Sequence, residues 1–106
     1  MSTEDEQQGL AQVIDSLKTH GWFPTRIWDG ECTLKVTGWE SAKIAEECSQ
    51  TDEAWLHFEH LKHGGWSNYI YLVWGNSPDE LIADHTLNAD FGLHIDAACR
   101  VVFPEA

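Results

Sequence analysis

Apolar residues recur at intervals of three and four positions in the first part of the chain, a spacing typical of a helix with one buried side. Ser2 or Thr3 can cap this helix, and acids at positions 4–6 suit the positive end of its dipole. Gly21 is a typical helix terminator. We therefore expect a first helix that ends before Gly21 and buries Leu10, Val13, Ile14 and Leu17.

Two short segments that follow have the character of paired strands. Thr25–Trp28 and Glu31–Val36 flank Asp29-Gly30, a favoured two-residue hairpin turn. Alternation along the second segment would place Cys32, Leu34 and Val36 on one face of the sheet.

The middle of the chain predicts helical structure. Thr37 and Glu40 have the spacing of a capping box, and a stripe of small residues then favours a helix over 39–49. Thr51 or Asp52 can cap a further helix that ends at Gly64-Gly65. This segment is either a second helix or the continuation of one bent helix. The two apolar stripes are Ala42, Ala45 and Cys48, and Trp55, Phe58 and Leu61.

The segment Tyr69–Trp74 is β-branched, aromatic and apolar on both faces, which indicates a central strand. Its apolar faces could be buried in the core or in a homodimer. Residues 80–86 either start a helix or alternate as a strand, and we favour a hairpin with the preceding strand because the connection is short. Asn88 can cap a final helix that buries Phe91, Ile95 and Ala98.

These elements together predict an α+β fold. A small antiparallel sheet of two hairpins packs with three to four helices, in the approximate order α-β-β-α(α)-β-β-α. The 106 residues contain no repeat or Pro/Gly-rich linker, so we expect one acidic globular domain over 1–106.

Charge is the feature that most restricts the function. The chain has 18 Asp and Glu against 6 Lys and Arg, a net charge of −12, yet 42% of its residues are hydrophobic and six are Trp. This composition indicates a folded domain with a negative surface rather than a disordered acidic tail. Anionic membranes and nucleic acids would repel that surface.

Three further observations favour a cytoplasmic protein that does not insert into a membrane. The acidic N-terminus lacks the basic and apolar segments of a signal peptide. No apolar run approaches the ~20 residues that cross a bilayer. The odd number of cysteines, without a CxxC pair, argues against a disulfide framework.

The acids are spread along the chain, and two groups of them are candidates for a binding surface. No Lys or Arg occurs between His63 and Cys99. If the acids there share a face, their carboxylates could replace the phosphates of a nucleic acid in a basic groove. A purely solvated acidic surface explains the same composition equally well. The first cluster contains Asp79, Glu80, Asp84, Asp90 and Asp96, and the second contains Glu46, Glu47, Asp52 and Glu53.

The tryptophans add candidate anchors for a partner. Trp55 and Trp74 fall on predicted core faces, whereas Trp28 and Trp66 lie beside turns or glycines, as Trp22 and Trp39 do. An exposed indole next to acids could stack on an arginine of a basic protein. Alternatively, these side chains close the ends of a small core.

Three histidines give a weaker candidate site. His57, His60 and His63 are three apart in the predicted second helix, so His60 and His63 could bind a metal with Glu59 or a remote ligand. HExxH is absent, and a solvated histidine face is the simpler interpretation. We assign no cofactor and no catalytic residue, because no nucleophile or phosphate-binding motif is present. We therefore expect no enzyme, with a metal-dependent activity as the exception.

Size, charge and missing catalytic motifs point to a small acidic binding or inhibitor protein that occupies a basic, nucleic-acid-binding surface of a partner protein. In general character the chain is similar to small acidic proteins of phages and mobile elements, including DNA mimics and anti-CRISPR or anti-restriction inhibitors. The alternatives are an immunity protein or antitoxin that neutralises a basic toxin enzyme, and a metal-binding protein that uses the three histidines.

Overall fold

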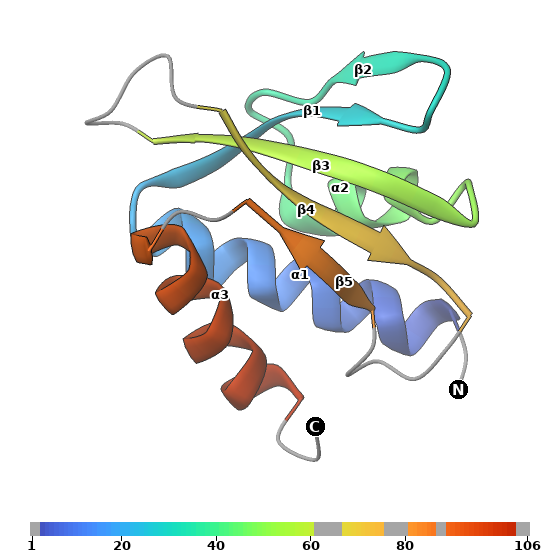
Figure 1. Cartoon of the computed structure of the whole chain (residues 1–106). Coiled ribbons are helices and arrows are strands. Elements are labelled where there is room, and N and C mark those ends of the chain that lie inside the picture. Colours follow the sequence, from blue (N-terminus) through green and yellow to red (C-terminus); the bar gives the residue numbers. More distant parts are fainter. Residues whose placement is uncertain (1–2, 61–66, 76–80, 87–88, 104–106) are drawn as a thin grey trace.

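The computed structural model describes residues 3–60, 67–75, 81–86 and 89–103. Within these residues the chain forms three helices and an antiparallel five-stranded sheet with the strand order β2-β1-β3-β4-β5 (Figure 1). The elements are α1 (Thr3–Thr19), β1 (Trp22–Trp28), β2 (Thr33–Lys35), α2 (Ser41–Cys48), β3 (Glu53–His60), β4 (Ser67–Val73), β5 (Ile82–His85) and α3 (Ala89–Val102).

The helices pack against one face of the sheet, and no described helix covers the opposite face (Figure 1). We call these the inner and the outer face. The α+β class, the first helix, the pairing of β1 with β2, the pairing of β4 with β5 and the last helix are confirmed. The predicted cap Asn88 lies outside the described residues.

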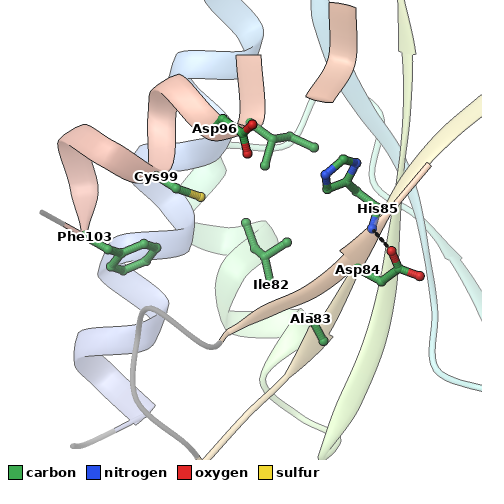
Figure 2. A pocket seen from close by; sticks show the side chains of 8 residues that line it. Ile82, Ala83, Asp84, His85, Asp96, Cys99 and Phe103 are labelled. Atoms are coloured by element: carbon green, nitrogen blue, oxygen red, sulfur yellow. Dashed lines mark hydrogen bonds between the residues drawn. The ribbon is translucent and has the colours of Figure 1, made fainter. Parts of the chain in front are cut away.

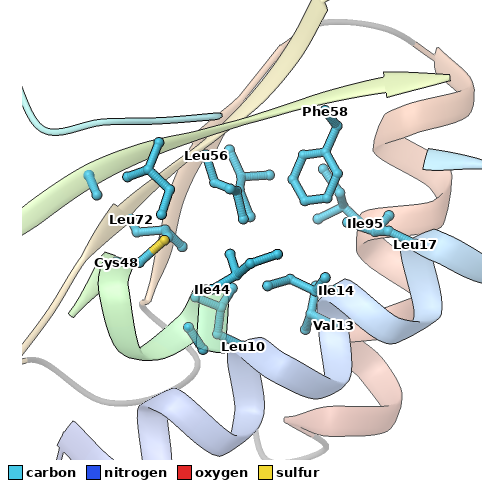
Figure 3. Close-up of a cluster of buried hydrophobic side chains, with 14 of the residues drawn as sticks. Leu10, Val13, Ile14, Leu17, Ile44, Cys48, Leu56, Phe58, Leu72 and Ile95 are labelled. Atoms are coloured by element: carbon cyan, nitrogen blue, oxygen red, sulfur yellow. The ribbon is translucent and has the colours of Figure 1, made fainter. Parts of the chain in front are cut away.

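The core lies between the inner face and the helices (Figure 3). The predicted stripe of α1 is completely buried, and Phe91, Ile95 and Ala98 of α3 are buried as expected. In α2 the exposed Ala42 does not join the core, and Ile44 takes its place. The capping box does not form either, because the Thr37 hydroxyl donates to the carbonyl of Thr25 and Glu40 makes no side-chain cap.

The expected second helix is wrong, because residues 53–60 form β3 at the centre of the sheet. Ala54, Leu56 and Phe58 are completely buried on the inner face, and the residues between them point outward. Trp55 therefore lies on the outer face, contrary to its predicted place in the core.

The first hairpin has a turn displaced by one residue from the expected Asp29-Gly30. Trp28 pairs with Thr33, and the backbone N–H of Asp29 donates to the carbonyl of Cys32, so Gly30 and Glu31 are the central residues. Gly30 has a φ of +102°, a left-handed conformation that costs other residues about 1–2 kcal/mol. Because β2 is an edge strand, its residues remain exposed, and only Val36 beyond it is buried.

Candidate functional site

A straight row of side chains crosses the outer face of the sheet. Successive cross-strand pairs join Thr33 of β2, Trp28 of β1, Trp55 of β3, Tyr71 of β4 and Asp84 of β5. Paired residues in a sheet point to the same face, so these five side chains are neighbours. We call Trp28, Trp55 and Tyr71 the aromatic row.

Neighbouring rings of the aromatic row pack against each other. The ring centroids of Trp28 and Trp55 are 4.8 Å apart, and those of Trp55 and Tyr71 are 4.7 Å apart with an angle of 21° between their planes. As a result, Trp55 and Tyr71 are half-buried although no helix covers them, whereas Trp28 is 39% exposed. The row offers a continuous apolar surface whose most accessible part is the Trp28 indole.

Carboxylates border the aromatic row at its Tyr71 end, and one further carboxylate lies in the hairpin turn that follows Trp28. The Tyr71 hydroxyl donates a hydrogen bond to Glu53, and this bond raises the pKa of Tyr71. Asp84 is the cross-strand neighbour of Tyr71 on the other side. Next to Trp28, the Asp29 carboxylate accepts the backbone N–H of Cys32 at 2.7 Å and that of Glu31 at 2.9 Å. These two bonds lower the pKa of Asp29, so it is ionised at neutral pH.

A second row, parallel to the first, carries positive charge. Lys35, Arg26, His57 and Tyr69 are in register across the outer face, and we call them the polar row. Burial lowers the pKa of His57, and the nearby charge of Arg26 lowers it further. The outer face is therefore divided into an aromatic part bordered by acids and a part with two cations.

The structure does not gather the first acidic cluster on one face. Asp79 and Glu80 lie outside the described residues. Asp84 belongs to the outer face beside Tyr71, whereas Asp90 and Asp96 are on α3, in the helical layer. Among the described members, only Asp84 borders the aromatic row.

Asp84 and Asp96 also line one hollow of about 360 Å³ between β5 and α3 (Figure 2). Ile82, Cys99 and Phe103 supply apolar surface there. The Asp84 carboxylate accepts the backbone N–H of His85 at 2.8 Å. Burial, with a smaller contribution from Asp96, raises the pKa of the Cys99 thiol to about 11, so this thiol is not a nucleophile at neutral pH.

The second acidic cluster runs from the end of α2 to the start of β3. Glu46 and Glu47 occupy the last turn of α2, Asp52 is exposed in the connection, and Glu53 reaches the aromatic row through its bond to Tyr71. The last turn of α2 contains no basic residue. Carboxylates at this negative end of the helix dipole are unfavourable by about 0.3–1 kcal/mol each. Glu47 offsets part of this cost through its ion pair with Lys43 at 3.9 Å, so helix stability leaves only Glu46 unexplained.

Of the two predicted aromatic anchors, Trp28 is exposed in the aromatic row, and Trp66 lies outside the described residues. The sequence reasoning missed Trp55 and Tyr71 as surface residues. The signal that pointed to Trp55 is the alternation over 53–60, which places Glu53, Trp55 and His57 on one face, but the three-residue spacing of Trp55 and Phe58 fits a helix as well.

The histidine metal site loses its geometric basis because its helix is a strand. His57 points to the outer face and His60 to the inner face, while His63 lies outside the described residues. Within the described ranges, no group of three or more His, Cys, Asp or Glu side chains could hold a metal ion.

Comparisons with protein-family models, with curated proteins and with solved structures find no significant match. In the part of the chain that the structure describes, no helix is both long enough and apolar enough to span a bilayer.

Proposed function

We propose that this protein is a small acidic inhibitor that binds a basic, nucleic-acid-binding surface of a partner protein, in the manner of DNA mimics and anti-defence proteins. The observation that carries the proposal is the aromatic row on the outer face, which no described helix covers, with Glu53 and Asp84 beside Tyr71 and Asp29 in the turn after Trp28. The cytoplasm is the compartment that suits its free cysteines, Cys32, Cys48 and Cys99.

The chemistry of the row suits arginine and lysine side chains. A guanidinium can stack on the exposed Trp28 indole beside Asp29, the next residue in the chain. A second cationic side chain of the partner can pair with Asp84, which is three strands away beside Tyr71. Aromatic anchors at the centre of an interface contribute most of the binding energy, and surrounding charges set orientation and association rate.

In the second acidic cluster, Glu53 belongs to this surface through its bond to Tyr71. Glu46 and Glu47 are on α2 in the helical layer, so the partner must also reach past the edge of the sheet to contact them. The carboxylates of this cluster would face the part of the partner that otherwise contacts phosphates, and binding would release the same counter-ions as nucleic acid does. Complex formation would therefore weaken steeply as salt concentration rises.

The polar row limits how the partner can approach. Arg26 and Lys35 would repel a basic groove laid across the whole outer face. The partner's basic surface therefore lies over the aromatic row and the second acidic cluster, and away from the polar row. The net charge of −12 argues against nucleic acid itself as the ligand.

Salt-resolved capture of a partner from a bacterial lysate tests the proposal. The immobilised protein should retain, at low salt, a nucleic-acid-binding protein that both added salt and competing duplex DNA release. Capture that resists both treatments would contradict the proposal. If the captured protein is a toxin enzyme, the inhibitor acts as an immunity protein or antitoxin through the same face.

Charge-reversal variants then locate the interface with the purified partner. Glu53→Lys combined with Asp84→Lys should greatly reduce affinity because both border the aromatic row. Glu40→Lys combined with Asp90→Lys is the charge-matched control, since both acids are exposed and lie outside the outer face, Glu40 before α2 and Asp90 on α3. Equal losses in both proteins would reject this face, while circular dichroism checks that each variant is folded.

A further inference from the structure

Three histidines from different elements surround Trp22 at one end of the sheet. His20 lies in the connection between α1 and β1, His60 ends β3, and His94 is on α3. The rings of His20 and His94 are stacked with centroids 4.0 Å apart and an angle of 9° between their planes. The ring of His60 meets the Trp22 ring edge-on at 4.5 Å.

Hydrogen bonds determine where the protons are in this cluster. The Trp22 indole N–H can only donate, and it lies 3.0 Å from Nδ1 of His94. His94 must therefore be neutral, with its own proton on Nε2. Nε2 of His60 lies 3.0 Å from the backbone carbonyl of His20, so this nitrogen is the donor.

Protonation of His94 conflicts with this arrangement. The added proton goes to Nδ1, where it faces the N–H of Trp22, so two donors meet and the hydrogen bond is lost. Burial is the main cause that lowers the pKa of His94, and His20 and His60 lower it further, while Asp90 on the same helix opposes them. On β5, His85 approaches α3 on the other side of Phe91.

Trp22 of β1 also packs against the buried residues of α3. Trp22 is 2% exposed, and its ring lies 4.9 Å from that of Phe91, which in turn packs against Phe58 at 5.6 Å. The Trp22–His94 hydrogen bond is thus part of the contact that holds the first half of α3 against the sheet. Protonation of His94 therefore weakens that contact directly.

We infer that His94, with Trp22, His20 and His60, makes the docking of α3 on the sheet sensitive to pH. Because the folded-state pKa of His94 lies below its ordinary value of 6.5, the contribution is complete above that value. It is lost as the pH falls through the folded-state pKa. Acidification therefore weakens the packing of α3 on the sheet, and this effect does not depend on the partner that the outer face binds.

Nuclear magnetic resonance of the free protein tests the inference directly. In a titration from about pH 8 to about pH 5, the His94 ring resonances should move with a midpoint below 6.5. The Trp22 indole N–H resonance, assigned with a Trp22→Phe variant, should follow the same midpoint. A His94 midpoint at or above 6.5, or a Trp22 resonance that ignores it, would overturn the inference.

Variants supply a second measurement. His94→Asn keeps an acceptor for the Trp22 N–H, because Oδ1 of asparagine takes the position of Nδ1, and it removes the titration. Its urea midpoint should therefore fall less than that of the wild type between about pH 7.5 and about pH 5.5. His57→Asn is the matched control, because His57 also has a lowered pKa but lies on the outer face. This control should leave the Trp22 titration unchanged. Wild-type pH dependence in His94→Asn would contradict the inference.

Discussion

Trp28 contributes to the outer face in two ways. Its ring packs on Trp55, and 39% of its surface remains exposed to solvent. The part of the ring that packs on Trp55 stabilises the fold, whereas the exposed part gains nothing from burial. The apolar area that Trp28 leaves at the surface favours docking, because an indole loses little conformational entropy when a partner covers it.

Replacing Trp28 with alanine should weaken binding beyond its effect on folding, which urea denaturation measures separately. Hot-spot aromatic residues contribute about 2 kcal/mol or more, so affinity for the captured partner should fall about 30-fold, measured by calorimetry. Phe23→Ala is the control, because Phe23 is 37% exposed on the same strand and face but lies outside the aromatic row. Similar losses for the two variants would argue against the row as the anchor.

Gly21 has two features that disfavour a side chain, a left-handed backbone conformation and a close neighbour. Its φ is +87°, and a Cβ placed there would lie 2.9 Å from Nε2 of His60. Gly38 has a similar φ of +83° with nothing within 4 Å of such a Cβ. The two glycines thus share the conformational requirement and differ only in the contact.

Alanine substitutions at these glycines should therefore differ in cost. Gly38→Ala should destabilise the protein by about 1–2 kcal/mol from the left-handed conformation alone. Gly21→Ala should cost more, because His60 must also move from its bond to the His20 carbonyl. Urea denaturation measures both, and equal costs would show that the His60 contact has no energetic weight.

At the level of elements, the segment 53–60 shows why part of the fold escaped prediction. Trp55 and Phe58 are three apart, which fits a helix, while Ala54, Leu56 and Phe58 alternate, which fits a strand. Both patterns share Phe58, and the strand is chosen because β1 and β4 pair with it on both sides. Those partners are distant in sequence, so local spacing could not decide between the two.

The stripe of α1, in contrast, was predictable because four apolar positions agree on a single helical face. The role of Glu6 in that helix was not predictable. It appeared to serve only the helix dipole, yet it is completely buried, with both carboxylate oxygens 3.3 Å from the backbone N–H of Gly75. For the candidate site, the sequence named Trp28, Glu53 and Asp84 as candidates, whereas the cross-strand register was needed to add Trp55 and Tyr71.

Helix α2 offers a test of whether its acids serve binding or folding. Glu46 is exposed in the last turn, where the helix dipole disfavours a carboxylate. Glu46→Lys should therefore stabilise the protein by about 0.3–1 kcal/mol and at the same time weaken binding to the basic partner. Thermal unfolding and calorimetry measure the two effects, with Glu46→Gln as an intermediate. A gain in stability without loss of affinity would remove Glu46 from the interface.

For the whole molecule, the net charge of −12 has opposite consequences for the free protein and for its complex. Like charges repel one another in the compact state, so screening them stabilises the fold. In the complex the same charges attract the partner, so screening them weakens binding. A merely solubilising acidic surface would show the first effect without the second.

Salt dependence should therefore reveal both effects in one protein. Raising NaCl from about 10 mM to about 100 mM shortens the screening length from about 30 Å to about 10 Å. The free protein should gain about 1 kcal/mol, or about 4–8 °C in Tm, most of it within this range. Over the same range the affinity for the captured partner should fall on a steep logarithmic slope. A Tm that stays constant or falls would show that the acids are already neutralised within the fold, and a flat affinity would contradict charge-driven binding.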